Sequence, residues 1–228
     1  KILRIITRMN VGGPARQVSF LQRRFLSDGH QSTLTYGMLD EDEGDMSGLL
    51  EKTAHTIFLN CLRRPISIKN DLLATVKLFW YFCGNDIHVV HTHTAKAGMV
   101  GRLALKLARP ARWCRGYSKT LCVHTFHGHV FSGYFSKALT RVYKGIERML
   151  WRWTDVVVVL TPKLGSEILG HLNSAPEKMH VIPLGLNLEP YLAVERKKIF
   201  GTSDRQPKVW VGWVGRMVDI KNPFRFIE

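Results

Sequence analysis

The chain has 228 residues, enough for one large α/β domain or for one domain and part of another. Apolar residues make up 45% of it, which excludes disorder as the main state, because a disordered chain lacks side chains to bury. The formal net charge of +15 indicates an anionic partner, whether a nucleotide phosphate, an anionic lipid surface or a nucleic acid, or else only a basic surface.

Cysteine usage and hydropathy bear on the compartment. The four cysteines, which form no CxxC pair, are Cys61, Cys83, Cys114 and Cys122. We expect them to be reduced thiols of a cytosolic protein. The longest apolar stretch, residues 72–83, is interrupted by Lys77 and is too short to span a bilayer. Because residues 1–4 lead straight into a strand pattern, we expect no signal peptide and a cytoplasmic protein, soluble or peripheral on the inner face of the cell membrane.

Short apolar runs that suit strands alternate with segments of helical periodicity along the chain. We predict strands at residues 3–7, 31–36, 56–59, 87–92, 121–126, 156–160 and 179–183. We predict helices from Pro14 onward and at residues 69–82, 95–107, 137–153 and 162–172. This alternation is typical of a doubly wound parallel sheet, so the predicted fold class is α/β with a Rossmann-like domain.

The domain division follows from the same pattern. Residues 1–184 are predicted to form the Rossmann-like domain. Residues 185–207 mix glycine, proline and charge, and we interpret them as an interdomain linker with one short helical piece. A strand at residues 208–214 and a helix near Asn222 and Pro223 open a second Rossmann-like unit, which is expected to begin at residues 208–228.

Gly12 and Gly13 follow the first predicted strand and precede the first helix. A glycine turn at a helix N-terminus suits an anion, because backbone N–H groups and the helix dipole favour negative charge there. A tight turn without a ligand is an equal alternative. The dinucleotide pattern GxGxxG is absent, so an NAD site has little support.

Histidines gather where two predicted strands end. His124 and His127 belong to the stretch HTFHGH, and His91 and His93 belong to the stretch HTHT. Ligands of open α/β sheets bind outside the carboxyl ends of the strands, where a histidine can hydrogen-bond a sugar hydroxyl or stabilise developing charge. A loop of solvent-facing histidines is the alternative. We expect no metal site, because no carboxylate or thiolate is suitably spaced.

Basic residues form two further candidate sites. Arg216 and Lys221 lie between a predicted strand and a predicted helix, where they suit a diphosphate, although ordinary surface basicity is the alternative. One face of the helix at residues 137–153 carries five cations, which are Lys137, Arg141, Lys144, Arg148 and Arg152. Together with the aromatic residues before it, this face resembles a membrane-surface element, and a core-packed helix with a solvated face is the simpler alternative.

Five segments, in this order, resemble a family 4 glycosyltransferase of the GT-B fold. They are the glycine loop at 10–14, VVHTHTAKAG at 89–98 with the following Gly101 and Arg102, HTFHG at 124–128, VIPLGLN at 181–187 and VGWVGRMVDIK at 211–221. The likeness covers nearly the whole chain. Leu184 and Asn222 depart from the family pattern, which often has asparagine and glycine at these positions.

The resemblance implies transfer of a sugar from a nucleotide-diphosphate donor, with retention of configuration and without a cofactor or an obligatory metal. It implies that Gly12 and Gly13 approach the donor phosphate and that His127 is the catalytic residue beside the donor sugar. It also implies that Arg216 and Lys221 clamp the diphosphate and stabilise the charge of the departing nucleotide. Many members act in polysaccharide biosynthesis on lipid-linked acceptors at the membrane, which agrees with the basic helix.

The same resemblance makes residues 1–184 the acceptor-side domain and residues 208–228 the start of the nucleotide-sugar domain. The paired glutamates of the family are expected beyond Glu228. We therefore expect residues 1–228 alone to have little or no transferase activity.

Two other functions stay open. A sugar-nucleotide 2-epimerase has a related fold, but it needs cleft carboxylates for acid–base chemistry, and none is convincingly placed in the first domain. A basic module that binds a membrane or a nucleic acid without catalysis would show steep salt dependence and no response to a nucleotide sugar. Nucleic acid is the weakest of these partners, because the aromatic residues are not arranged as in an RNA-binding strand motif.

Overall fold

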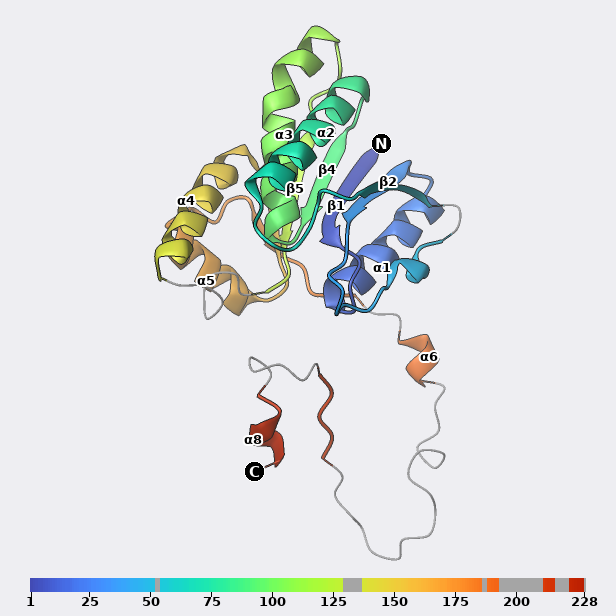
Figure 1. Cartoon of the computed structure of the whole chain (residues 1–228), viewed down its shortest axis with the longest axis vertical. Coiled ribbons are helices and arrows are strands. Elements are labelled where there is room, and N and C mark those ends of the chain that lie inside the picture. Colours follow the sequence, from blue (N-terminus) through green and yellow to red (C-terminus); the bar gives the residue numbers. More distant parts are fainter. Residues whose placement is uncertain (52–53, 129–136, 186–187, 193–210, 216–221, 228) are drawn as a thin grey trace, which may run out of the picture. The chain divides into compact units, whose positions relative to one another are not determined.

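A computed structural model describes residues 1–51, 54–128, 137–185, 188–192, 211–215 and 222–227. The chain divides into two compact units, Lys1–Gly185 and Leu186–Glu228. The first unit holds a seven-stranded sheet with the strand order β3-β2-β1-β4-β5-β6-β7, in which every pairing is parallel (Figure 1). The predicted α/β fold class is confirmed.

Every strand and helix predicted for the first unit is present, with small shifts at the ends except at the C-terminal end of α3. The strands are β1 (Ile2–Arg8), β2 (Ser32–Gly37), β3 (His55–Leu59), β4 (Val89–His93), β5 (Leu121–Phe126), β6 (Val156–Val159) and β7 (Met179–Val181). The helices are α1 (Gly13–Ser27), the 3-10 turn η1 (Ser47–Leu49), α2 (Ile68–Gly84), α3 (Ala95–Cys114), α4 (Lys137–Trp153) and α5 (Pro162–Leu172).

The two faces of the sheet meet different helices, because side chains alternate along each strand. Leu3 and Ile5 of β1 are buried together with Phe82 of α2 and other side chains of α2 and α3. Ile6 points to the opposite face and is buried with Val18 of α1. The helices α2 and α3 lie side by side over the first of these faces (Figure 1).

Glycines allow α3 to lie close to the sheet. A Cβ atom on Gly98 would lie 2.5 Å from Cε1 of His124, and one on Gly101 would lie 2.8 Å from Cγ2 of Thr92. Neither neighbour has room to move, because both side chains belong to buried strand residues. The glycines of the AKAGxxGR stretch therefore serve close helix–strand packing.

Arg102 of the same stretch joins α3 to α4. Its guanidinium is buried, and Nη2 lies 2.8 Å from each carboxylate oxygen of Glu147. Nε donates a hydrogen bond of 2.8 Å to the carbonyl of Gly98 within α3. A charge that is buried with a hydrogen-bonded counter-charge is tolerated, whereas either partner alone would be costly.

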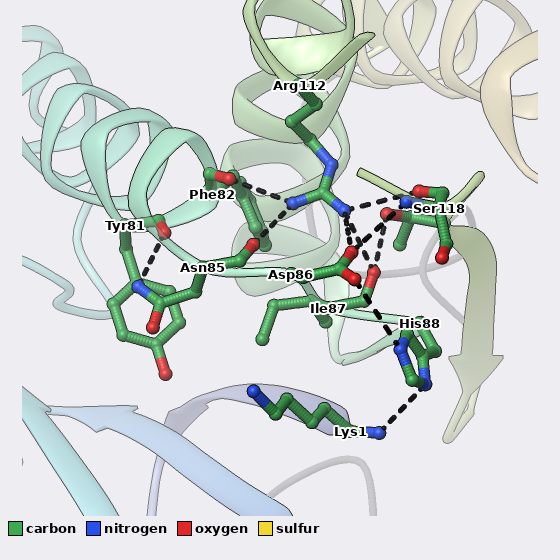
Figure 2. A network of polar contacts seen from close by, with 10 residues as sticks. Lys1, Tyr81, Phe82, Asn85, Asp86, Ile87, His88, Arg112 and Ser118 are labelled. Carbon is green, nitrogen blue, oxygen red and sulfur yellow. Dashed lines mark hydrogen bonds and ion pairs between the residues drawn. The ribbon is translucent and has the colours of Figure 1, made fainter. Parts of the chain in front are cut away.

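The C-terminal end of α3 corrects a predicted boundary. The helix runs seven residues beyond the predicted end at residue 107, through Pro110, to Cys114. Arg112 in its last turn donates hydrogen bonds to four backbone carbonyls (Figure 2). They belong to Phe82, Asn85, Ile87 and Ser118, at distances of 2.8, 2.6, 3.0 and 3.4 Å. These contacts stabilise the last turn, although Pro110 cannot donate a backbone hydrogen bond.

The second unit contains two short helices within its described residues. Helix α6 (Glu189–Leu192) lies in the predicted linker, and α8 (Phe224–Ile227) follows Asn222 and Pro223, where a helix was predicted. The strand predicted at residues 208–214 is wrong for Val211–Val214, which have no strand structure. A strand needs a hydrogen-bonded neighbour, and no strand is present elsewhere in the described part of this unit.

Within the described residues, no helix combines the length and the apolar character that crossing a membrane requires.

Candidate active site

The strand order reverses at β1, which has β2 on one side and β4 on the other. Since β1, β4 and β5 are parallel, their carboxyl ends meet at one edge of the sheet. The glycine loop follows β1 at this edge, Thr94 follows β4 and His127 follows β5. Such a switch point is the usual ligand-binding crevice of an open α/β sheet.

The glycine loop leads directly into α1. The helix begins at Gly13 and has Pro14 in its first turn, as predicted. A Cβ atom on Gly13 would meet nothing within 4 Å, and one on Gly12 would make only an ordinary contact at 3.7 Å. Among the described residues, nothing would therefore clash with a Cβ atom at either glycine. Anion binding by Gly12 and Gly13 stays a prediction.

The loop between β2 and η1, which is acidic at residues 40–45, supports the glycine loop. The backbone N–H of Gly12 donates to Sδ of Met46 at 3.4 Å, and Arg8 forms an ion pair with Glu43, with Nη2 2.6 Å from Oε1. Burial opposes ionisation of Glu43, but hydrogen bonds from Arg8 and from the backbone of Asp40 outweigh it and hold the pKa of this carboxyl below its usual value. The carboxylate is thus ionised and engaged in positioning the loop.

The predicted histidine cluster divides between the two faces of the sheet. His93 lies beside Ile6, on the face that α1 covers, and its Nδ1 is 3.1 Å from Nε2 of His127. The ring of His91 lies against that of His93, with centroids 4.0 Å apart. His124 lies on the opposite face, beneath α3. The sequence places these histidines together, but only His91, His93 and His127 form one group.

The three histidines of this group are neutral near pH 7. Burial, helped by the charge of Arg4, lowers the pKa of His91 to about 3 and that of His127 to about 4. Burial also lowers the pKa of His93 well below 6.5, with smaller effects of His91 and Arg4. A neutral imidazole can donate one hydrogen bond and accept another. The low pKa makes His127 a weak base.

His93 and His127 each keep one ring nitrogen that makes no hydrogen bond to the described residues. Their other nitrogens, Nδ1 of His93 and Nε2 of His127, form the hydrogen bond between the two rings, in which one nitrogen donates and the other accepts. The other two nitrogens, Nε2 of His93 and Nδ1 of His127, are buried and have no hydrogen-bond partner among the described residues. Buried nitrogens are nearly always satisfied in folded proteins, so this pair is a candidate for contact with a ligand.

Two threonines that are not among the predicted site residues, Thr7 of β1 and Thr94, meet at the start of α3. Thr94 has φ of +67°, a region that favours glycine and is strained for a β-branched residue. Its Oγ1 lies 2.7 Å from Oγ1 of Thr7, which also accepts a hydrogen bond from the backbone N–H of Ala97 at 3.2 Å. Thr7 of β1 thus caps α3. A threonine before a helix is a capping signal, but the sequence does not show that the cap comes from another strand.

Arg216 and Lys221, the predicted diphosphate clamp, lie outside the described residues, as do the aromatic residues at 130–135. Their roles stay predictions. Within the part of the chain that the structure describes, no three His, Cys, Asp or Glu side chains are arranged to hold a metal ion.

The basic helix α4 has the predicted bounds, and its cations differ in their surroundings. The predicted set is Lys137, Arg141, Lys144, Arg148 and Arg152, of which the side chain of Lys137 is not described. Arg141 and Arg152 are exposed, whereas Lys144 is half-buried. Arg148 donates through Nε to the carbonyl of Leu172 at 2.9 Å, at the end of α5. Arg148 is therefore engaged in joining two helices, and binding of a membrane by α4 stays a prediction.

Most of this chain matches a known protein family. The sequence profile of Glycosyltransferase Family 4 matches residues 11–190, which include the glycine loop and both histidine stretches. This chain belongs to Glycosyltransferase Family 4. The predicted family and its GT-B type of Rossmann-like fold are thereby confirmed, and the 2-epimerase alternative is weakened.

A relative from Escherichia coli supports the family membership. It is UDP-Gal:alpha-D-GlcNAc-diphosphoundecaprenol alpha-1,3-galactosyltransferase, and it is 29% identical to this chain over 196 residues. The match covers 84% of this chain and 48% of that enzyme, so the chain spans about half the length of this relative.

Solved structures share the fold at lower identity. A glycosyltransferase from Rickettsia africae has a TM-score of 0.60 at 16% identity, over 86% of this chain and 47% of that one. Sucrose-phosphate synthase from Thermosynechococcus elongatus has a TM-score of 0.58 at 17% identity, over 82% of this chain and 49% of that one. At these identities the likeness concerns the fold alone.

Proposed function

We propose that the Family 4 protein that contains this chain transfers a sugar from a nucleotide-diphosphate donor to a lipid-linked acceptor, with retention of configuration and without a cofactor or an obligatory metal. The family match over residues 11–190 carries this proposal. The Escherichia coli relative, whose name specifies UDP-galactose and a diphospholipid-linked GlcNAc, supports both the donor class and the acceptor class.

The reaction breaks the bond between the anomeric carbon and the diphosphate. The anomeric carbon bonds to the oxygen of an acceptor hydroxyl, which releases its proton, and the departing diphosphate gains negative charge. Groups that face this charge stabilise the transition state more than the ground state. We assign this role to the N-terminus of α1 at Gly12 and Gly13 and to the side chains of Arg216 and Lys221.

His127 is the proposed contact to the donor sugar. Its position beyond β5 at the switch point and its unpartnered Nδ1 support a hydrogen bond to a sugar hydroxyl. A pKa of about 4 leaves the imidazole neutral, which suits hydrogen bonding to a hydroxyl better than proton abstraction. His93 would hold the ring in place through the contact of 3.1 Å.

The proposed acceptor also determines where in the cell the enzyme acts. A glycan precursor on a lipid diphosphate stays in its bilayer, so the enzyme must act at the membrane surface. We therefore propose a peripheral enzyme of polysaccharide biosynthesis at the cytoplasmic face of the cell membrane.

The test is transfer by the protein that contains this chain from radiolabelled UDP-sugars to a lipid diphosphate carrying GlcNAc, with the anomeric configuration of the product read by NMR. His127→Ala should lower kcat on the order of a hundredfold, because a contact to the reacting sugar is lost. His55→Ala, at an exposed position of β3, is the matched control and should leave kcat unchanged. Absence of transfer from every nucleotide sugar, or an inverted product, would overturn the proposal.

A further inference from the structure

The outer face of α2 carries a row of exposed apolar side chains. Ile68, Leu72, Val76 and Trp80 follow one another at steps of four, which places them along one side of the helix. Their exposed fractions are 85%, 62%, 41% and 66%. Leu73 lies beside this row and is 43% exposed.

This row is additional to the side of α2 that packs in the core. Ala74, Leu78 and Phe82 point to α3 and the sheet and are fully or almost fully buried. The helix is therefore apolar on both sides, although only one side has a partner among the described residues. Contiguous exposed apolar side chains of this extent are typical of an interaction surface.

The exposed charges of α2 are positive. Lys69 and Lys77 are exposed on the same side of α2, at steps of four from Leu73. Asp71, the one acidic residue of α2, is buried and forms an ion pair with Lys96, with Oδ1 2.7 Å from Nζ. An apolar row with lysines beside it and a tryptophan at one end is the pattern of a helix that lies in a bilayer interface.

We propose that the outer face of α2 docks on an anionic lipid bilayer, with the axis of the helix parallel to the membrane plane and with Leu72, Val76 and Trp80 inserted among the lipid chains. Lys69 and Lys77 would contact anionic headgroups. A second copy of the chain is a poorer occupant, because a two-fold contact through this face brings the lysines of both copies together.

An apolar groove lies between α3 and α4, near the start of α2. It has a volume of about 120 Å³ and is lined mainly by apolar side chains of α3 and α4, among them Met99, Val142 and Ile146. Ile66, two residues before the exposed row, also lines it and is itself 57% exposed. Ile66 thus places the groove near the N-terminal end of the exposed row, whereas Asp71, which also lines it, belongs to the buried side of α2.

Vesicle flotation of the whole chain tests the docking. Vesicles of phosphatidylcholine with phosphatidylglycerol are compared with vesicles of phosphatidylcholine alone. The double variant L72Q/W80Q should lower the partition coefficient on the anionic vesicles by about tenfold or more, because two inserted side chains are lost. F20Q, which changes a 40% exposed aromatic of α1, is the matched control and should float like the unchanged chain.

Charge-reversal variants distinguish binding of the vesicles by α2 from binding by α4. K69E/K77E should lower binding to anionic vesicles, whereas R141E/R152E in α4 should leave most of it. Circular dichroism and the urea midpoint check that each variant is folded. Unchanged flotation of L72Q/W80Q, loss of flotation only with the α4 variant, or a dimer that dissociates with L72Q/W80Q would each overturn the proposal.

The docking proposal does not rest on the proposed transferase activity. Transfer to a water-soluble acceptor, measured in parallel on the protein that contains this chain, should be unchanged by L72Q/W80Q. A protein that floats but transfers no sugar would refute the transferase alone, and one that transfers sugar but does not float would refute the docking alone.

Discussion

Gly98 has no room for a side chain, because a Cβ atom there would lie 2.5 Å from the ring of His124 and 3.0 Å from Nη2 of Arg102. We expect Gly98→Ala to lower the free energy of unfolding by about 1–3 kcal/mol, since an overpacked core must shift. Urea unfolding followed by circular dichroism measures the change.

Gly145→Ala in α4 is the matched control. A Cβ atom on Gly145 would meet nothing within 4 Å, so this change should stabilise the protein by about 0.5–1 kcal/mol through helix propensity. Equal effects of the two substitutions would contradict the close packing of α3.

The histidines show which features of single residues the sequence does not predict. The stretch HTFHGH indicates a polar cluster at a strand end, and His127 does lie at the carboxyl edge beside His93. His124 is turned away beneath α3, where Gly98 leaves room for it. The side to which a strand residue points depends on which helix covers which face, and a motif does not contain that information.

At the scale of elements, the buried pair of Arg102 and Glu147 is the main polar link between α3 and α4. Arg102→Met should lower the free energy of unfolding by about 3–5 kcal/mol, because Glu147 is left buried without its counter-charge. The double variant R102M/E147M should recover much of this loss. A double-mutant cycle in urea measures the coupling, and additive losses would show that the pair is not coupled.

The elements themselves were largely predictable from the sequence. Hydrophobic periodicity gave the bounds of α4 and α5, and the apolar run at residues 156–160 predicted the strand β6. The end of α3 was missed, because the helix continues through Pro110 and the contacts of Arg112 come from residues far along the chain. The outer side of α2 could not be told from the inner side, because both are apolar.

At the scale of the whole molecule, the histidines make stability depend on pH. The pKa of His91 is about 3 and that of His127 about 4, and those of His93 and His124 are also lowered, in each case chiefly by burial. Below pH 6.5 the unfolded chain binds protons that the folded chain does not. Stability should therefore fall as the pH drops from 7 to 4, by about 1.4 kcal/mol per pH unit for each such histidine.

Urea midpoints at pH 7 and pH 5 test this dependence. His127→Gln removes one of the titrating groups and should make the decline shallower, whereas His55→Gln, at an exposed position, should not. The prediction fails if the midpoint stays constant or rises as the pH is lowered.

The strand order also matters while the chain is being synthesised. β1 is made before β4, but it lies between β2 and β4, and its residue Ile2 pairs with Val89. Until β4 has left the ribosome, one edge of β1 has no neighbour, and Leu3 and Ile5 lack the helices that later cover them. Nascent chains of this kind expose apolar strand surface for seconds. We expect the first segment of this chain to be a substrate for the chaperones that bind at the ribosomal exit.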